Sequence, residues 1–204
     1  MTNLKNFPRT LVLYPTRRGI AFALFNAPLS LSDWGTKRAS GVTKDADAMH
    51  AAKKLIERYK PDVLVMEDMQ GRGSRRVSRI RRLNGAIARH GVRQGIDIAA
   101  YSRTAIRDAF AVVGASQKHD INCAIVALIP ALSAYQPRKR RAWDDESAAQ
   151  GVFDAVSLGL TFFANTGRLD LAQTAYGEEE TPFSVQCARM PYWVPSLPIL
   201  ELCS

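Results

Sequence analysis

The segment 61–68, with the sequence PDVLVMED, constrains the fold of this chain more than any other stretch. A turn-forming proline opens it, apolar residues with strand character follow, and two adjacent carboxylates, Glu67 and Asp68, close it. A near-continuous apolar run is typical of a buried parallel strand. Ligands in open α/β sheets bind beyond the carboxyl ends of the strands, so Glu67 is well placed to hold a metal ion. On this segment alone, a solvated loop that simply begins with two acids is an equally good interpretation.

The neighbouring sequence predicts an α/β fold around this strand. Three strand-like segments come first, and a tight turn over 15–19 joins the first two into a hairpin. Apolar residues at helical spacing predict a helix over 45–59, which Pro61 stops. A single helical crossover implies that the strand over 61–68 pairs in parallel. The other predicted strands are 10–14, 20–26, 29–37 and, as a fifth and parallel strand, 96–101.

The segment 71–95 is strongly basic, and no acid lies between Asp68 and Asp97. The spacing of apolar residues from Val77 to Ile87 predicts a helix with one apolar stripe and arginines on its other faces. Repulsion among these arginines costs stability unless a polyanion neutralises it. The net charge of +9 and the sequence pI of about 9.8 agree with contacts to nucleic-acid phosphates, with a plain basic face as the alternative. The residues predicted to bind nucleic acid, in this segment and elsewhere in the chain, are Arg17, Arg72, Arg75, Arg76, Arg79, Arg82 and Lys118.

The second half of the chain is predicted to be mostly helical. Ser102 is the predicted N-cap of a helix over 104–113. A polar turn over 114–120 is predicted to precede an apolar helix over 121–132.

A last helix and a tail complete the predicted organisation. The helix is expected from 143 to about 164, and Asp154 interrupts its otherwise apolar surface. Three acids near its start suit the positive N-terminal end of a helix. Residues 1–165 are therefore expected to form one domain, and residues 166–204 an extension that packs on this domain or on a partner.

Composition argues against several classes of protein. No apolar run reaches the roughly 18 residues that a membrane span needs, and the N-terminus lacks the apolar stretch of a secretory signal, so a cytoplasmic protein is expected. The cysteines are few, far apart and without CxxC spacing, which argues against a disulfide framework and a structural zinc site. They are Cys123, Cys187 and Cys203.

The order and spacing of these pieces resemble the ribonuclease H-like fold and, within it, the RuvC group of Holliday-junction resolvases. The matching pieces are LYPTRRGIAFALF, PDVLVMED, YSRTAIRDAFAVVGASQKHDINCAIV and FDAVSLGL, which together span roughly Thr10 to Phe163. The resemblance implies a mixed five-stranded sheet, with three antiparallel and two parallel strands, flanked by helices. It also implies an endonuclease that uses Mg²⁺ or Mn²⁺ to hydrolyse phosphodiesters in branched DNA, and that works as a homodimer on a two-fold symmetric junction.

The resemblance further implies which residues form the site. Glu67 matches the glutamate of the fourth strand, and Asp154 matches the aspartate of the last helix, so both are expected to be catalytic and to bind the metal. Hard divalent ions prefer carboxylate oxygens, and Asp68 is a further candidate ligand. RuvC-like proteins often place a basic residue near the scissile phosphate. Lys118 matches that residue, with a solvated turn lysine as the alternative.

Two acids that the resemblance leads us to expect are missing. Tyr14 stands where the first strand normally ends in Asp, and a phenol with a pKa of about 10 is a poor Mg²⁺ ligand at neutral pH. Gly151 stands where a second aspartate of the last helix often lies. The candidates to replace a missing acid are Asp68, Asp144, Asp145 and Glu146. Neither Asp144 nor Glu146 is a clean replacement, because Asp144 lies nearly three turns before Asp154 and Glu146 lies off its face of the helix. An active nuclease with rearranged acids and a catalytically silent nucleic-acid-binding module both fit the sequence, and an assembly protein is a third alternative.

Overall fold

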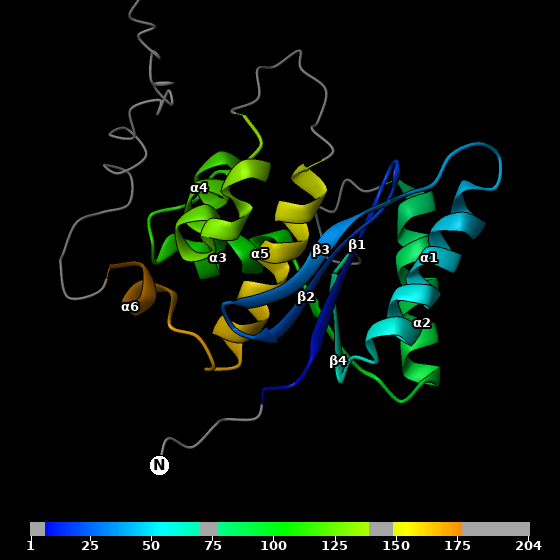
Figure 1. Ribbon diagram of the computed structural model, residues 1–204, viewed down its shortest axis with the longest axis horizontal. Helices are drawn as coiled ribbons and strands as arrows, with labels where there is room; N and C mark the ends of the chain where they lie inside the picture. The colour runs from blue at the N-terminus through cyan, green and yellow to red at the C-terminus, as the bar shows by residue number, and fades with distance from the viewer. Residues whose placement is uncertain (1–6, 70–76, 139–148, 177–204) are drawn as a thin grey trace, which may run out of the picture.

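The apolar segments pair into one five-stranded sheet in the computed structural model of the chain, which describes residues 7–69, 77–138 and 149–176 (Figure 1). The strands are β1 (Thr10–Thr16), β2 (Gly19–Ala27), β3 (Ser30–Arg38), β4 (Val63–Glu67) and β5 (Asp97–Tyr101). They lie in the order β3-β2-β1-β4-β5. The β1–β2 and β2–β3 pairs are antiparallel, whereas β4 pairs in parallel with both β1 and β5. The predicted mixed sheet is confirmed.

Helices cover both faces of this sheet. They are α1 (Lys44–Tyr59), α2 (Ser78–Arg93), α3 (Arg103–Ala111), α4 (Lys118–Leu128), α5 (Gln150–Asn165) and α6 (Leu171–Tyr176), with a 3-10 helix, η1 (Pro130–Tyr135), after α4. Figure 1 shows α1 and α2 on one face and α3, α4 and α5 on the other. Each face has its own cluster of buried apolar residues, so the sheet separates two cores.

The alternation of side chains along a strand decides which residues face which layer. Val12 and Tyr14 of β1 belong to the core on the α5 side, as does Val65 of β4. Glu67 lies two residues after Val65 and therefore shares its face. Because β1 and β4 are parallel, Tyr14 and Glu67 lie at the same edge of the sheet as well as on the same face.

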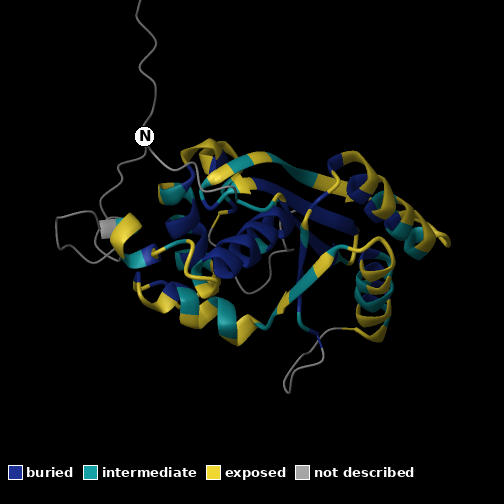
Figure 2. Cartoon of the chain, turned by 90° about the horizontal axis from the view of Figure 1, so that it is seen from below, coloured by how far each residue is buried: buried dark blue, intermediate teal, exposed yellow. Residues whose placement is uncertain are grey.

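Helix α5 is buried along almost its whole length (Figure 2). It can lie close to β2 because it carries glycines where the two elements meet. A Cβ atom on Gly159 would lie only 2.4 Å from the Cε2 atom of Phe25. This close approach fixes α5, and with it Asp154, against the strands.

Two predicted boundaries on the α5 side of the sheet are wrong. Helix α4 begins at Lys118, inside the predicted turn over 114–120, because Gln117 and Asp120 form a capping box that starts the helix early. The predicted helix over 121–132 ends at Leu128, because Pro130 cannot continue an α-helix and instead opens η1.

Other elements agree with the sequence or lie outside the described residues. The basic helix exists and runs on to Arg93, and the hydroxyl of Ser102 accepts a hydrogen bond from the Ala105 N–H at 3.1 Å, as an N-cap does. The start of the last helix, predicted at 143, falls outside the described residues. Within the predicted extension, the described part includes Leu171, which packs into the α5-side core. None of the described helices is long and apolar enough to cross a membrane.

Candidate functional site

A cavity of about 440 Å³ opens at the carboxyl ends of β1 and β4, on the face covered by α5. Alternation along the two strands brings Tyr14 and Glu67 into its wall, and α5 contributes Asp154. The starts of two further helices complete the wall, α3 with Arg103 and α4 with Lys118. The edge that the sequence predicts for chemistry is therefore the edge that carries the cavity.

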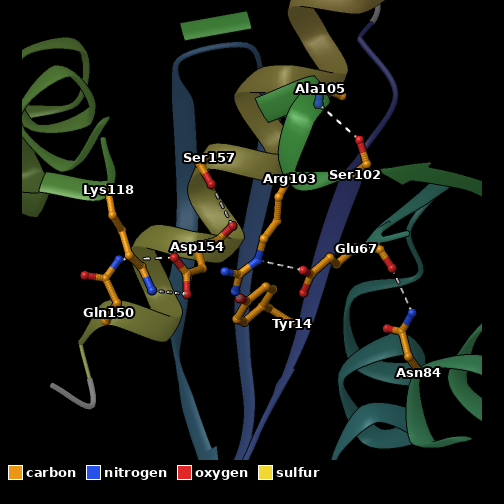
Figure 3. Close-up of polar contacts among 10 residues, drawn as sticks. All are labelled: Tyr14, Glu67, Asn84, Ser102, Arg103, Ala105, Lys118, Gln150, Asp154 and Ser157. Carbon is orange, nitrogen blue, oxygen red and sulfur yellow. Dashed lines mark hydrogen bonds and ion pairs between the residues drawn. The ribbon is translucent and has the colours of Figure 1, made fainter. Parts of the chain in front are cut away.

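Glu67 and Tyr14 are joined by the guanidinium group of Arg103 (Figure 3). The Arg103 Nε donates to Glu67 Oε1 at 3.0 Å, and Nη2 donates to the hydroxyl oxygen of Tyr14 at 3.3 Å. The Glu67 side chain is only 3% exposed, whereas that of Arg103 is 56% exposed. One planar side chain, open to the cavity on one side, therefore compensates a buried carboxylate and ties together the ends of two strands.

The end of β5 places Arg103 in this position. The strand stops at Tyr101, Ser102 caps the next helix, and Arg103 is the first residue of that helix. Since β5 lies next to β4, with Tyr101 opposite Glu67, the first side chain of α3 reaches across to the end of β4. The backbone of Glu67 is also held from the other side, where the Asn84 amide of α2 donates to the Glu67 carbonyl oxygen at 2.9 Å.

The side chains around Arg103 stabilise its protonated, positively charged form. Burial by itself would lower the pKa of the guanidinium group, but the oxygens of Tyr14 and Glu67 outweigh that effect and raise the pKa above its ordinary value. Arg103 is therefore a permanent cation at this edge of the sheet.

Asp154 has a cation of its own. The Lys118 Nζ lies 3.2 Å from Asp154 Oδ2, and the Gln150 Nε2 donates to Asp154 Oδ1 at 3.1 Å (Figure 3). Gln150 is in turn held by Asn122 of α4, through reciprocal amide hydrogen bonds of 3.0 and 3.2 Å. Among the described residues, the carboxylate of Asp154 is thus held by at least the charged side chain of Lys118 and the amide of Gln150.

In the part of the chain that the structure describes, the charged side chains that line the cavity include more cations than acids. The cations are Arg103, Arg107 and Lys118 and the acids are Glu67 and Asp154, whereas Asp68 is not among the described residues that line the cavity. A cavity with this balance attracts anions with delocalised charge, such as phosphodiesters, which arginine and lysine bind well.

The described residues do not fit the two-metal site that the resemblance implies. Among them, no group of three or more acids, histidines or cysteines is arranged to hold a metal ion. Glu67 and Asp154 are each paired with a cation instead. An acid at the position of Gly151 would be crowded, because a Cβ atom there lies 3.0 Å from the Ala21 Cβ and 3.2 Å from the Thr16 Cγ2. Asp144, Asp145 and Glu146 lie outside the described residues.

The predicted nucleic-acid-binding arginines divide into three groups. Arg17, in the turn between β1 and β2, and Arg82, on α2, are exposed. Arg79 is engaged within the protein, because it pairs with Asp45 of α1 and its Nη2 lies 3.4 Å from the Arg17 carbonyl oxygen. The predictions for Arg72, Arg75 and Arg76 fall outside the described residues.

Sequence reasoning identified Glu67, Asp154 and Lys118, which the structure brings to one cavity, but it missed Arg103. Its signal was weak and consisted of an arginine directly after a capping serine at the end of a predicted strand. Gln150 was missed as well, although it lies one helical turn before Asp154 and therefore on the same face.

The sheet order, the helices on both faces and the cavity at the ends of the central strands define the ribonuclease H-like class of folds. In sequence, the chain matches no protein-family model and none of the curated proteins. In structure, it is similar to Thermus thermophilus RuvC, with a TM-score of 0.54 at 16% identity over 78% of this chain and 97% of that chain.

Two further solved structures are similar to the chain. T. thermophilus RuvC in complex with Holliday junction substrate gives a TM-score of 0.52 at 12% identity, over 78% of this chain and 97% of that chain. The yeast mitochondrial Holliday junction resolvase Ydc2 gives 0.54 at 12% identity, over 82% of this chain and 84% of that chain. The predicted resemblance to RuvC-type resolvases is therefore confirmed at the level of the fold.

Proposed function

We propose that this protein binds branched DNA, with the edge of the sheet that carries the cavity facing the phosphate backbone. The observation that carries the proposal is the set of cations in the cavity of a RuvC-type fold, where, among the described residues, Arg103, Arg107 and Lys118 outnumber the acids Glu67 and Asp154. Sequence-independent binding of DNA depends mainly on such contacts with phosphates.

The topology supports a broader basic surface at the same edge. The turn between β1 and β2 follows the carboxyl end of β1, and it carries Arg17 and Arg18, both exposed. Helix α2 begins a short distance after the carboxyl end of β4, and Arg82 lies in its second turn. Parallel strands place their carboxyl ends together, so these arginines and the cavity belong to one edge of the molecule.

Metal-dependent cleavage of the bound DNA is the second candidate function. It is supported by Glu67 and Asp154, the two acids that the resemblance implies, because both line the cavity beside Lys118. It is weakened by the cation that holds each of them and by Tyr14 at the end of the first strand. For this reason binding without hydrolysis is the function that we place first.

A homodimer is part of the same proposal, since a four-way junction has two-fold symmetry that a symmetric dimer would match. The mass of the full chain in solution, with and without junction DNA, tests it. A monomer in both conditions would remove the dimer from the proposal. The cytoplasm remains the predicted location.

The experiment that tests the proposed function compares a labelled four-way junction with a linear duplex of the same base composition. Wild-type protein and Glu67→Gln are each titrated onto both substrates in EDTA, and binding is followed by fluorescence anisotropy. We expect both proteins to bind, to prefer the junction and to lose affinity steeply with salt. Equal, weak binding to both substrates would contradict the proposal.

The same samples, with Mg²⁺ or Mn²⁺ added, test the second candidate. Nicks that appear only on the junction, only with metal and only with Glu67 intact would establish cleavage. Binding without nicks under all conditions would leave DNA binding as the function.

A further inference from the structure

The buried carboxylate of Glu67 is compensated within the cavity in a way that does not depend on whether the protein binds DNA. Glu67 needs a positive partner, because its side chain is 3% exposed and a buried, uncompensated carboxylate is strongly unfavourable. A metal ion could supply that charge, and so could a side chain. The structure supplies it with Arg103, whose Nε lies 3.0 Å from Glu67 Oε1.

The same guanidinium group also reaches the strand end where the resemblance expects the first acid. Tyr14 occupies that position, and its hydroxyl oxygen accepts from Arg103 Nη2 at 3.3 Å. A phenol offers this donor a neutral oxygen, whereas Mg²⁺ prefers carboxylate oxygens and water. The residue at position 14 therefore suits the arginine better than it suits a metal.

The second acid of the cavity is occupied in a similar way. Asp154 lies 3.2 Å from the Lys118 ammonium group and accepts from the Gln150 amide at 3.1 Å. A divalent cation that approached either acid would meet a positive side chain already in place, at a distance where repulsion between like charges is large.

We propose that Arg103 occupies a divalent-cation site, so that the wild-type protein has a built-in cation at Glu67 and binds no divalent metal there. Removal of the guanidinium group would then take away the cation that lies 3.0 Å from Glu67 Oε1 and allow a metal ion to approach that oxygen. The proposal assigns Arg103 a role in the cavity that is distinct from any contact with DNA.

The test measures Mn²⁺ binding directly, by electron paramagnetic resonance of the free ion and by calorimetry, with full-length protein and no DNA. We expect no saturable binding to the wild-type cavity and saturable binding to Arg103→Gln. The added binding should be absent from the double variant Arg103→Gln/Glu67→Gln. Mn²⁺ should also raise the melting temperature of Arg103→Gln but not that of the wild type, because a ligand stabilises only the state that binds it.

Arg107→Gln is the matched control. Arg107 lies one turn after Arg103 on α3 and lines the same cavity, and within the part of the chain that the structure describes it makes no hydrogen bond or ion pair with Glu67. The control should resemble the wild type, with no saturable binding of Mn²⁺. If it bound Mn²⁺ as Arg103→Gln does, general loss of positive charge would explain the effect and the proposal would be wrong.

Two further results would overturn the proposal. One is saturable Mn²⁺ binding by the wild type that is lost in Glu67→Gln. This measurement requires no variant of Arg103. The other is the absence of Mn²⁺ binding by Arg103→Gln, or by Arg103→Met if the glutamine variant does not fold. Because neither result involves DNA, failure here can be distinguished from failure of the proposed function.

Discussion

Arg103 combines two tasks that a metal ion and its ligands share in a carboxylate site. It neutralises a buried acid, and it fixes the relative position of the ends of β1 and β4 through Tyr14 and Glu67. An arginine can do both because its donors have a fixed planar geometry and its charge persists at all ordinary pH values. The acid of the fourth strand is thereby retained in a cavity whose described residues do not fit a two-metal site.

The first prediction concerns the stability that this contact provides. Arg103→Gln should lower the free energy of unfolding by about 1 to 3 kcal/mol, because Glu67 stays buried without its charged partner. Tyr14→Phe should cost less, about 1 kcal/mol, because it removes one hydrogen bond at the edge of the same group. Urea denaturation of both variants and the double variant measures these effects. If the losses in unfolding free energy of the two single variants add up to that of the double variant, the three side chains do not act as a unit.

The second prediction concerns Tyr59, on the other face of the sheet. Burial, and then the hydrogen bond that its hydroxyl donates to Asp33, raise the pKa of Tyr59 from its ordinary value of 10.0 to about 12. The unfolded chain therefore loses this proton first as the pH rises. The contribution to stability is complete below about pH 10 and is lost as the pH approaches 12.

We therefore expect the wild type to lose about 1 kcal/mol more stability than Tyr59→Phe between pH 9 and about pH 11. Urea denaturation at the two pH values measures this difference, and the comparison with the variant cancels the titration of other groups. An equal loss in both proteins would show that Tyr59 titrates normally.

At the scale of the element, the contact between α5 and β2 positions the acid of the last helix. Gly159 meets the ring of Phe25, and Gly151 meets Ala21 and Thr16, so small residues allow the helix to lie directly on the strands. An acid at Gly151 would push against the sheet before it could hold a metal ion. Glycine at position 151, in place of an aspartate, therefore also serves the close packing of α5 on the strands.

The third prediction tests that contact with one methyl group. Gly159→Ala places a Cβ atom 2.4 Å from Phe25 Cε2, so we expect a loss of about 1 to 3 kcal/mol in the free energy of unfolding. Gly85→Ala is the matched control within α2, where the nearest atom to the new Cβ would be the Arg89 Nη1 at 3.4 Å. The control should be neutral or stabilising, because alanine favours helix over glycine. Similar losses in both variants, measured by thermal unfolding, would contradict this explanation.

The elements of this fold could be predicted from the sequence where the signal is local. The apolar run before Glu67 and the apolar stripe of the basic helix each fix an element, because a period of two or of 3.6 residues identifies a strand or a helix. Arg103 could not be predicted in the same way. Its role depends on β5 lying beside β4, which brings together residues 36 positions apart. The start of α4 was missed because the side-chain hydrogen bonds of Gln117 and Asp120 outweighed the polar composition of the segment.

At the scale of the whole molecule, the carboxyl ends of the parallel strands bring several basic side chains to one edge. The cavity cations Arg103, Arg107 and Lys118 lie where the strands end, and the exposed Arg17 and Arg82 extend the basic surface from the adjacent turn and helix. A net charge of +9 on the chain would increase the rate of association with DNA. Only the placement of charge at one edge, however, would orient the protein on a branched substrate.

The fourth prediction separates orientation from bulk charge by comparing two arginines on α2. Arg82 lies in the second turn of this 16-residue helix, near the cavity edge, whereas Arg93 is its last residue, about 16.5 Å further along the helix axis and toward the opposite edge of the sheet. Both are exposed, and Arg82→Gln and Arg93→Gln remove the same charge. Only Arg82→Gln should weaken binding to a four-way junction and reduce the slope of log K against log salt by about one, because only Arg82 would lie against a phosphate.

Anisotropy titrations of both variants over a series of salt concentrations measure the slopes. Equal losses would mean that the protein responds to its total charge and that the cavity edge does not face the DNA.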